Sequence, residues 1–299
     1  LDDRSAQYFS LSRSITKAQS YPSSLMGTLA LLRQMYSDAD WYAKGNATTT
    51  DLSLEALNSN KSLVQIIEAK DKSHDLRADK IGDSYGVQYT ILGGGNEFER
   101  IEEIKATNAK FIIPINFPDA YDVSNPYAVD YVSLQDMRYW NQAPSNPKVL
   151  ADNGIKFSLT TYDLKSPANF KEKLIKAIDY GLSSTKALEA LTTVPAEILG
   201  KSNEIGALKT GYLANFLISS GDIFDKTTTL YENWVQGTKS VINAMDVKDI
   251  RGDYQLMVQG KSYDVVISGD ISKPKIEVKQ DTTKLSSKIA YDNNWVTLS

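Results

Sequence analysis

Between residues 63 and 181 the sequence alternates short apolar runs with amphipathic segments, and this alternation limits the possible folds more than any other feature. The apolar runs occupy residues 63–69, 87–92, 111–115 and 155–161, and helical periodicity occurs at about 75–85, 98–107, 134–141 and 169–181. The first three runs are almost entirely apolar, which is typical of strands buried on both faces. This order predicts an α/β fold with a parallel sheet and right-handed crossovers. A closed barrel of this class has eight such units, so about four units predict either part of a barrel or an open four-stranded sheet.

The sequence on either side of this stretch has a different pattern of apolar and polar residues. Residues 21–45 predict a helix that begins near Pro22, and residues 51–57 predict a shorter one. After Gly200, short strands are predicted at residues 213–218, 231–236, 241–243, 254–258, 263–268, 275–279 and 294–298. Hairpin turns are expected at Gly260-Lys261 and Gly269-Asp270. We therefore predict a barrel portion over residues 1–200 and an antiparallel β-rich domain over residues 201–299.

Composition excludes several kinds of partner and site. The net charge is −4 and there is no basic stripe, so nucleic acid is a poor candidate partner. No apolar run approaches the roughly 20 residues that span a bilayer. The given residues contain no signal peptide, but a processed secretion signal stays an alternative because the sequence begins at Leu1 rather than at a methionine. The absence of cysteine excludes disulfides and thiolate metal sites but leaves the compartment open. The single histidine, His74, stands at a predicted helix start, where a solvated or capping role is the usual one.

Residues 187–224 read ALEALTTVPAEILGKSNEIGALKTGYLANFLISSGDIF and carry a recognisable order of small residues, proline, glycine and apolar strand. Pro195 suits the first turn of a helix, and Gly200 suits the left-handed residue that ends one. The segment resembles the C-terminal signature of the amidohydrolase superfamily. This resemblance implies a metal-dependent hydrolase fold, and it favours a partial or complete (β/α)8 TIM-like barrel over the open sheet. Asn215 departs from the pattern, because the superfamily usually has aspartate there.

Further motifs resemble one subgroup of that superfamily. Residues 21–27 (YPSSLMG), 30–34 (ALLRQ), 38–42 (DADWY), 116–118 (NFP) and 143–147 (APSNP) are similar to imidazolonepropionase-like amidohydrolases of bacteria. The similarity is greatest to long, exported members with two amidohydrolase-like halves. It implies hydrolysis of C–N bonds in cyclic amides by an intact, zinc-binding parent. It also implies that this chain is the C-terminal half of one barrel with its β-sandwich, and that the rest of the parent chain or a second subunit is its partner.

The resemblance locates the metal ligands at strand ends, and this chain departs from the family pattern at each of them. The His-x-His pair and the bridging residue of the superfamily have no counterpart here. Where the fifth and sixth family strands end in histidines, this chain has Glu68 and Gly93-Gly94-Gly95. Where the eighth strand supplies an aspartate as general base, Tyr162 takes the expected position and Asp163 follows one residue later. A shift of one residue on a strand turns a side chain to the other face, so Asp163 recovers the catalytic role only if the strand end bulges.

We therefore predict that the chain alone lacks a hydrolytic metal centre. A zinc site needs about three protein ligands and an open position for water, and Glu68 as a metal ligand with Asp163 makes at most two. We also predict a polar pocket of a kind that fits a small ligand, lined by Glu68, Lys70, Gly94, Asn116 and Tyr162. Three hypotheses follow: a metal-free module that supports a catalytic half, an enzyme completed by another chain, and a small-molecule binding module.

Overall fold

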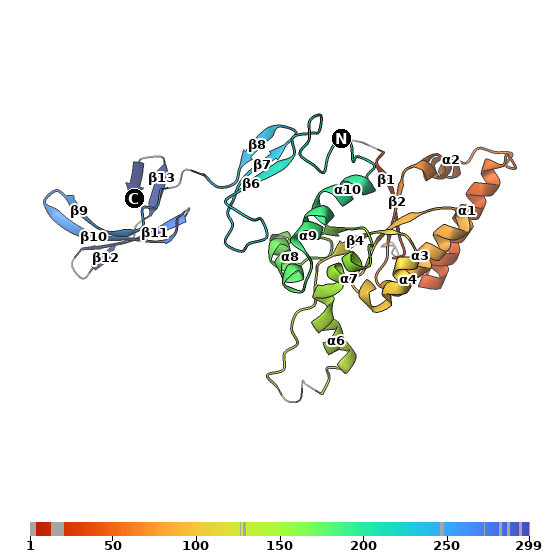
Figure 1. The fold of residues 1–299 in the computed structure, drawn as a ribbon, viewed down its shortest axis with the longest axis horizontal. Helices are drawn as coiled ribbons and strands as arrows, with labels where there is room; N and C mark the ends of the chain where they lie inside the picture. Colours follow the sequence, from red (N-terminus) through yellow and green to blue (C-terminus); the bar gives the residue numbers. More distant parts are fainter. Residues whose placement is uncertain are drawn as a thin grey trace. The chain divides into compact units, whose positions relative to one another are not determined.

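The computed structural model describes residues 4–12, 21–125, 127, 130–245, 248–271, 273–280, 283–285, 288–292 and 295–298. The chain divides into two compact units, Leu1–Leu213 and Ala214–Ser299 (Figure 1). No described helix combines the length and the apolar character needed to cross a membrane. The predicted domains, residues 1–200 and 201–299, remain a prediction.

The first unit is built on a five-stranded parallel sheet, in agreement with the predicted α/β class. Its strands run in chain order across the sheet: β1 (Ala6–Ser10), β2 (Val64–Glu68), β3 (Tyr89–Leu92), β4 (Lys110–Pro114) and β5 (Phe157–Thr160). Four of them were predicted. β1 was missed because AQYFS is short and mixes polar with aromatic residues, and only its pairing with β2 makes it a strand.

Helices follow the strands, and some of them pack against the sheet (Figure 1). They are α1 (Leu25–Ala43), α2 (Leu52–Ser59), α3 (Lys72–Tyr85), α4 (Ile101–Ala106), α6 (Leu134–Gln142), α7 (Asn146–Asp152), α8 (Phe170–Asp179), α9 (Ser184–Leu191) and α10 (Thr193–Ile198), with short 3-10 turns at Asn60–Ser62, Glu97–Arg100, Ala143–Ser145 and Pro167–Asn169. Gly200 follows α10 with φ 67°, the left-handed conformation that the sequence predicted there. α7 was not predicted. Proline is tolerated in the first turn of a helix, which is where Pro147 lies.

The core of the first unit lies between the sheet and its helices. β3 is buried along its whole length, as predicted for a strand covered on both faces. In β2, by contrast, Gln65 and Ile67 are buried while Ile66 and Glu68 are half-buried. Each buried large aliphatic side chain contributes about 1.5–3 kcal/mol, so the helix-covered face supplies most of the packing energy. The opposite face is where half-buried polar groups remain available for a site.

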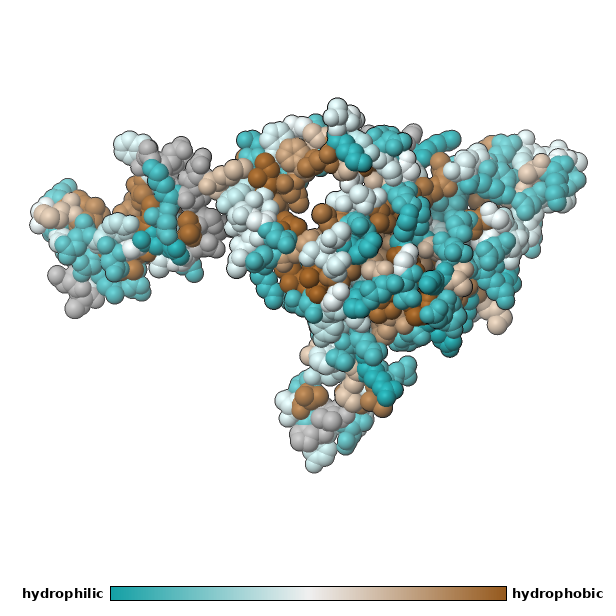
Figure 2. All heavy atoms as spheres, in the orientation of Figure 1, coloured by the Kyte–Doolittle hydropathy of each residue, from teal (hydrophilic) through white to brown (hydrophobic). Residues whose placement is uncertain are grey.

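An arm formed by residues 119–125, 127 and 130–142, which includes α6, projects from the rest of the first unit (Figure 1). Its exposed side chains include Tyr127, Tyr131 and Leu134. Hydrophobic residues are visible on its surface in Figure 2. Single exposed apolar side chains are common on protein surfaces, and the structure does not show what covers these.

The second unit contains antiparallel sheets, as predicted for the tail. Its strands are β6 (Phe216–Ser219), β7 (Leu230–Val235) and β8 (Thr238–Val241) in one sheet, β9 (Gly252–Val258), β10 (Lys261–Asp270), β11 (Lys273–Gln280) and β12 (Thr283–Leu285) in another, and β13 (Ile289–Asp292) with β14 (Trp295–Leu298). Val265, Ile267 and Val278 form a small buried core. The last predicted strand begins at residue 294, which lies outside the described residues.

Turn chemistry corrects two boundaries in this unit. The predicted strand at 241–243 lies earlier, as β8, because Gln236 and Gly237 both have positive φ, 50° and 78°, and form the turn. Gly269 and Asp270 do not form a turn; they continue β10 and pair with Pro274 and Lys273. The turn at Gln236 and Gly237 has positive φ at both central residues, as a type I′ hairpin requires.

Candidate functional site

Polar side chains from several strands meet at one edge of the parallel sheet. Because all the strands of the first unit run in the same direction, their carboxyl ends share this edge, where ligands bind in parallel α/β proteins. The predicted site residues all lie at or just beyond these ends: Glu68 and Lys70 at β2, Gly94 after β3, Asn116 after β4, and Tyr162 and Asp163 after β5.

Glu68 is the centre of a hydrogen-bonded group that also contains Tyr8 and Tyr162, here called the Glu68 cluster. The Tyr8 hydroxyl donates to Oε2 at 2.8 Å, and the Tyr162 hydroxyl donates to Oε1 at 2.9 Å. Tyr8 lies on β1 and Tyr162 follows β5, the two opposite edge strands of the sheet. The sheet must therefore curl strongly enough for both edges to reach the end of β2. Sequence reasoning missed Tyr8, because β1 itself was missed.

The three groups of the cluster fix one another's protonation. Burial acts to raise the pKa of Glu68, but the hydrogen bonds from Tyr8, Tyr162 and Ser10, together with the charge of Lys70, outweigh burial and lower it. Burial and the hydrogen bond to Glu68 raise the pKa of the Tyr8 phenol. The hydrogen bond to Glu68, followed by burial, raises that of Tyr162. Near neutral pH the cluster thus holds one carboxylate anion between two neutral phenol donors.

The residues at this edge do not fit a catalytic zinc ion. Such a site needs about three His, Cys, Asp or Glu ligands. In the part of the chain that the structure describes, no three side chains of these types come together to hold a metal. Both oxygens of Glu68 already accept phenol hydrogen bonds. His74 is elsewhere: its Nδ1 lies 2.9 Å from Oδ1 of Asp71, the residue that caps α3.

The glycines after β3 allow close packing of the loops, and a pocket-lining role for Gly94 stays a prediction. A β-carbon on Gly94 would collide with the carbonyl oxygen of Lys70, and one on Gly93 would collide with the Glu97 carboxylate. Gly95 has φ 89° and donates its N–H to Glu97 Oε1 at 2.9 Å. Lys70 is exposed, and its charge helps to lower the pKa of Glu68.

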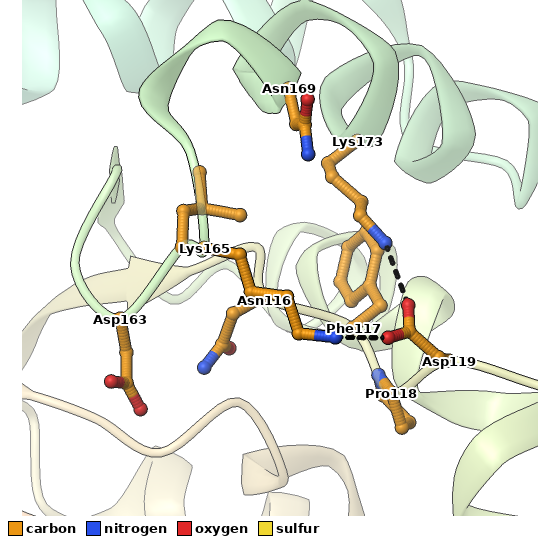
Figure 3. A pocket seen from close by; sticks show the side chains of 9 residues that line it. Asn116, Phe117, Pro118, Asp119, Asp163, Lys165, Asn169 and Lys173 are labelled. Atoms are coloured by element: carbon orange, nitrogen blue, oxygen red, sulfur yellow. Dashed lines mark hydrogen bonds and ion pairs between the residues drawn. The ribbon is translucent and has the colours of Figure 1, made fainter.

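Asp163 and Asn116 line a separate cavity of about 180 Å³ between the ends of β4 and β5 (Figure 3). β5 ends at Thr160, and Asp163 has φ 61°, so it lies in a turn rather than on the strand. The rule of alternating strand faces therefore does not apply to it. None of the described residues makes a hydrogen bond to the Asp163 carboxylate, and its catalytic role remains a prediction. Of the predicted pocket residues, Asn116 lines this cavity, whereas Glu68 and Tyr162 bond to each other.

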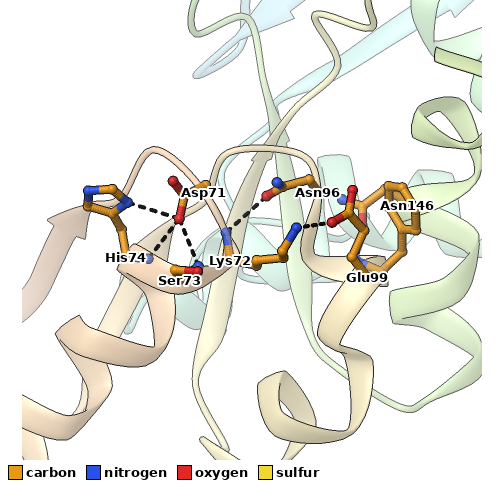
Figure 4. A network of polar contacts seen from close by, with 8 residues as sticks. Asp71, Lys72, Ser73, His74, Asn96, Glu99 and Asn146 are labelled. Carbon is orange, nitrogen blue, oxygen red and sulfur yellow. Dashed lines mark hydrogen bonds and ion pairs between the residues drawn. The ribbon is translucent and has the colours of Figure 1, made fainter. Parts of the chain in front are cut away.

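The loops after β2 and β3 are tied together beside the site (Figure 4). Asp71 Oδ1 accepts from the backbone N–H of Ser73 and of His74 at 2.8 and 3.0 Å. The backbone N–H of Lys72 donates to Asn96 Oδ1 at 2.9 Å, and its side chain pairs with Glu99. These contacts hold the strand ends in place, and the histidine belongs to this capping network.

Two fully buried acids behind this edge were missed by the sequence analysis. Asp75 lies in the first turn of α3 and Glu97 in the turn after β3, and both are 0% exposed. Asn146 donates to Glu97 Oε2, while both oxygens of Asp75 lack a hydrogen-bond partner among the described residues. An acid in a first helical turn is ordinary in sequence, so nothing marked Asp75 as buried.

Comparison with known proteins finds a match to one family model and a similarity of fold to solved structures. Residues 127–262 match the sequence model described as the amidohydrolase family. The curated protein amidohydrolase tasK of Hapsidospora irregularis is 28% identical over 99 residues, which are 32% of this chain and 10% of that protein.

Solved structures are similar in fold at low sequence identity. An amidohydrolase from Thermotoga maritima MSB8 has a TM-score of 0.60 and 20% identity, over 73% of this chain and 56% of that one. An uncharacterized protein has a TM-score of 0.50 and 14% identity, over 79% of this chain and 55% of that one. The chain thus spans little more than half the length of these two structures.

Proposed function

We propose that the chain, whose residues 127–262 match the amidohydrolase family model, is a metal-free part of an amidohydrolase barrel that supports a catalytic half elsewhere in a larger protein. One observation carries the proposal: Tyr8 and Tyr162 bind the carboxylate of Glu68, the acid at the strand end where a metal ligand is expected. In this proposal residues 1–200 are the barrel portion and residues 201–299 the β-rich domain.

The cluster is suited to structural support because it joins three separate strands. A metal centre links strand ends by shared coordination, and here a carboxylate with two phenol donors links β1, β2 and the segment after β5. Hydrogen bonds to a charged group contribute about 1.5–3 kcal/mol each when they are shielded from water, and less when exposed. The linkage therefore stabilises the curl of the sheet without an ion.

Metal analysis tests this proposal. The purified chain is expected to hold fewer than about 0.1 zinc ions per chain, and added Zn²⁺ should not raise its Tm saturably, because about three ligands are needed. Stoichiometric zinc that is lost in Glu68→Ala and kept in Glu102→Ala, an exposed acid of α4, would overturn the proposal.

We assign the chemistry of the family to the parent protein. The motif at residues 21–27 and Asn116-Phe117-Pro118 support an imidazolonepropionase-like parent that hydrolyses C–N bonds in cyclic amides. The chain alone should leave such amides unchanged, while the full-length parent should hydrolyse them. Hydrolysis by the isolated chain that survives exhaustive chelation would contradict this assignment.

A second candidate function is an active hydrolase completed by other strands. It is favoured by the open sheet, in which, among the described strands, β1 pairs only with β2 and β5 only with β4. Strands from the rest of the parent chain or from a second subunit would then add to these edges and bring further ligands. Mixing the chain with the separately purified remainder of the parent distinguishes the two. Zinc uptake that depends on Glu68 would favour a hydrolase completed by other strands. Formation of a complex without zinc uptake would favour the supporting role.

A further inference from the structure

We propose that the cavity between the ends of β4 and β5 binds a small carboxylate-bearing molecule through the ammonium group of Lys173. The site lies at the carboxyl end of the sheet, where parallel α/β proteins bind ligands. It is distinct from the Glu68 cluster, and the proposal stands whether or not the chain ever holds a metal.

Apolar and polar side chains both line the cavity, as in small-molecule sites. Phe117 and Leu164 supply the apolar lining, and Asn116 and Asn169 supply amide groups (Figure 3). Asn169 precedes α8 but makes no capping hydrogen bond with its side chain. Both amides are therefore available to a ligand in a cavity of about 180 Å³.

Lys173 forms a long ion pair with Asp119 but no hydrogen bond to a described residue. Its side chain is only 18% exposed, and its Nζ lies 3.8 Å from Oδ1 of Asp119, which is too far for a hydrogen bond. No hydrogen bond joins Lys173 to any of the described residues. The neighbouring Lys165 differs: it is 86% exposed and bonds to Asp119 Oδ2 at 2.6 Å. A half-buried ammonium without a hydrogen bond is costly, and a ligand carboxylate would satisfy it.

Asp119 indicates which ligand chemistry fits. Its carboxylate already lies between two ammonium groups, so a planar group of this size and charge is accommodated there (Figure 3). Asp119 is 67% exposed and can turn outward when a ligand competes for the lysines. The charges of Lys165, Lys173 and Lys176 all act on Asp119. Of these lysines, Lys165 and Lys173 line the cavity, together with the carboxylates of Asp119 and Asp163. When Asp119 turns outward, a ligand carboxylate meets two cations and one anion, which favours its binding.

The opposite side of the cavity sets a second requirement. Asp163 accepts no hydrogen bond from the described residues and lies across from the lysines (Figure 3). A ligand that also carries an N–H or O–H group would donate to it. The site therefore favours hydroxy acids or amide acids over simple carboxylates.

A titration followed by NMR tests the proposal on the whole chain, labelled with ¹⁵N. The probes are acetate, lactate and inorganic phosphate, with chloride as the ionic-strength control. We expect saturable shifts at Asn116, Asn169 and Lys173, with lactate binding more tightly than acetate. Lys173→Met should weaken lactate binding about tenfold or more, the effect of losing a charge-assisted hydrogen bond. Lys80→Met, which removes an exposed lysine of α3, should leave it unchanged.

Asp119→Asn should change lactate affinity in the opposite direction from Lys173→Met, so it still tests the proposal if Lys173→Met folds poorly. It removes the internal competitor, so lactate should bind several-fold more tightly. The proposal is overturned if the shifts follow ionic strength alone, if phosphate binds more tightly than lactate, or if Asp119→Asn weakens binding.

Discussion

Two acids of the first unit, Glu68 at the end of β2 and Asp75 in the first turn of α3, lie seven residues apart and have opposite environments. Glu68 is half-buried and accepts hydrogen bonds from two phenols. Asp75 is fully buried, and both of its oxygens lack a donor among the described residues. The pKa of Glu68 is lowered although burial opposes this, whereas burial and then the charge of Glu97 raise that of Asp75 well above its ordinary value. Hydrogen-bond donors therefore decide which carboxyl is held as an anion.

Glu97 combines the deep burial of Asp75 with hydrogen-bond donors, as Glu68 has. It is as deeply buried as Asp75, but it accepts hydrogen bonds from the Gly95 N–H and from Asn146. Burial still raises its pKa, although these bonds oppose the shift. Asp75 and Glu97 together have too few hydrogen-bond donors to stabilise two buried negative charges, so this pair holds a proton. The Glu68 cluster has donors for its single carboxylate, which is held as an anion.

The largest effect is expected from Glu97→Ala. The substitution leaves the Gly95 N–H and the Asn146 amide without their acceptor and opens a cavity, so the free energy of unfolding should fall by about 3 kcal/mol or more. Urea denaturation measures the loss. Glu97→Gln keeps one acceptor oxygen and should lose less. Equal losses for the two variants would show that the donors to Glu97 do not matter.

Asp75→Asn should stabilise the protein at neutral pH by about 1–3 kcal/mol, because it removes an acid that folding keeps from ionising. In the wild type this acid binds its proton more tightly in the folded state. Its contribution is therefore fully present below the unfolded pKa of about 3.9 and is lost as pH rises through the raised folded pKa. Urea midpoints across this pH range should fall in the wild type and fall less in Asp75→Asn. A parallel decline in both proteins would contradict the assignment.

Glu68→Gln should destabilise the protein by about 1–2 kcal/mol, because two phenols lose a charged acceptor at a partly exposed site. The pKa of Glu68 is lowered in the folded state, so its contribution is present above the unfolded pKa and is lost as pH falls through the folded one. The variant should therefore lose less stability in acid than the wild type. Its Tyr8 phenol should also titrate at lower pH, which ultraviolet absorbance in alkaline solution detects.

Tyr162→Phe is expected to have the smallest effect, about 0.5–1 kcal/mol, since the Tyr162 ring is 42% exposed. Combined with Glu68→Gln in a double-mutant cycle, it should show a coupling energy of similar size. Tyr180→Phe, which changes an exposed tyrosine outside the Glu68 cluster, is the control and should be neutral. Additive effects of Tyr162→Phe and Glu68→Gln would mean that the hydrogen bond contributes no stability.

Much of the fold could be predicted from local patterns. The strands β2 to β5 follow from continuous apolar runs, and the residues at their ends could be named because parallel strands share an edge. β1 could not be found, since its five residues lack a clear period. Asp163 was placed on a strand face, but the chain turns after Thr160, and local periodicity contains no signal for that turn.

The sequence by itself determined the order of strands and helices, the antiparallel tail and the shortage of imidazole and thiol ligands, because these depend on residue type and short-range period. Only the tertiary structure decided that Tyr8 and Tyr162, 60 and 94 residues from Glu68, bond to it. The same holds for the burial of Asp75 without a donor. Such contacts depend on how far the sheet curls and on how a helix packs, and no stretch of neighbouring residues encodes either one.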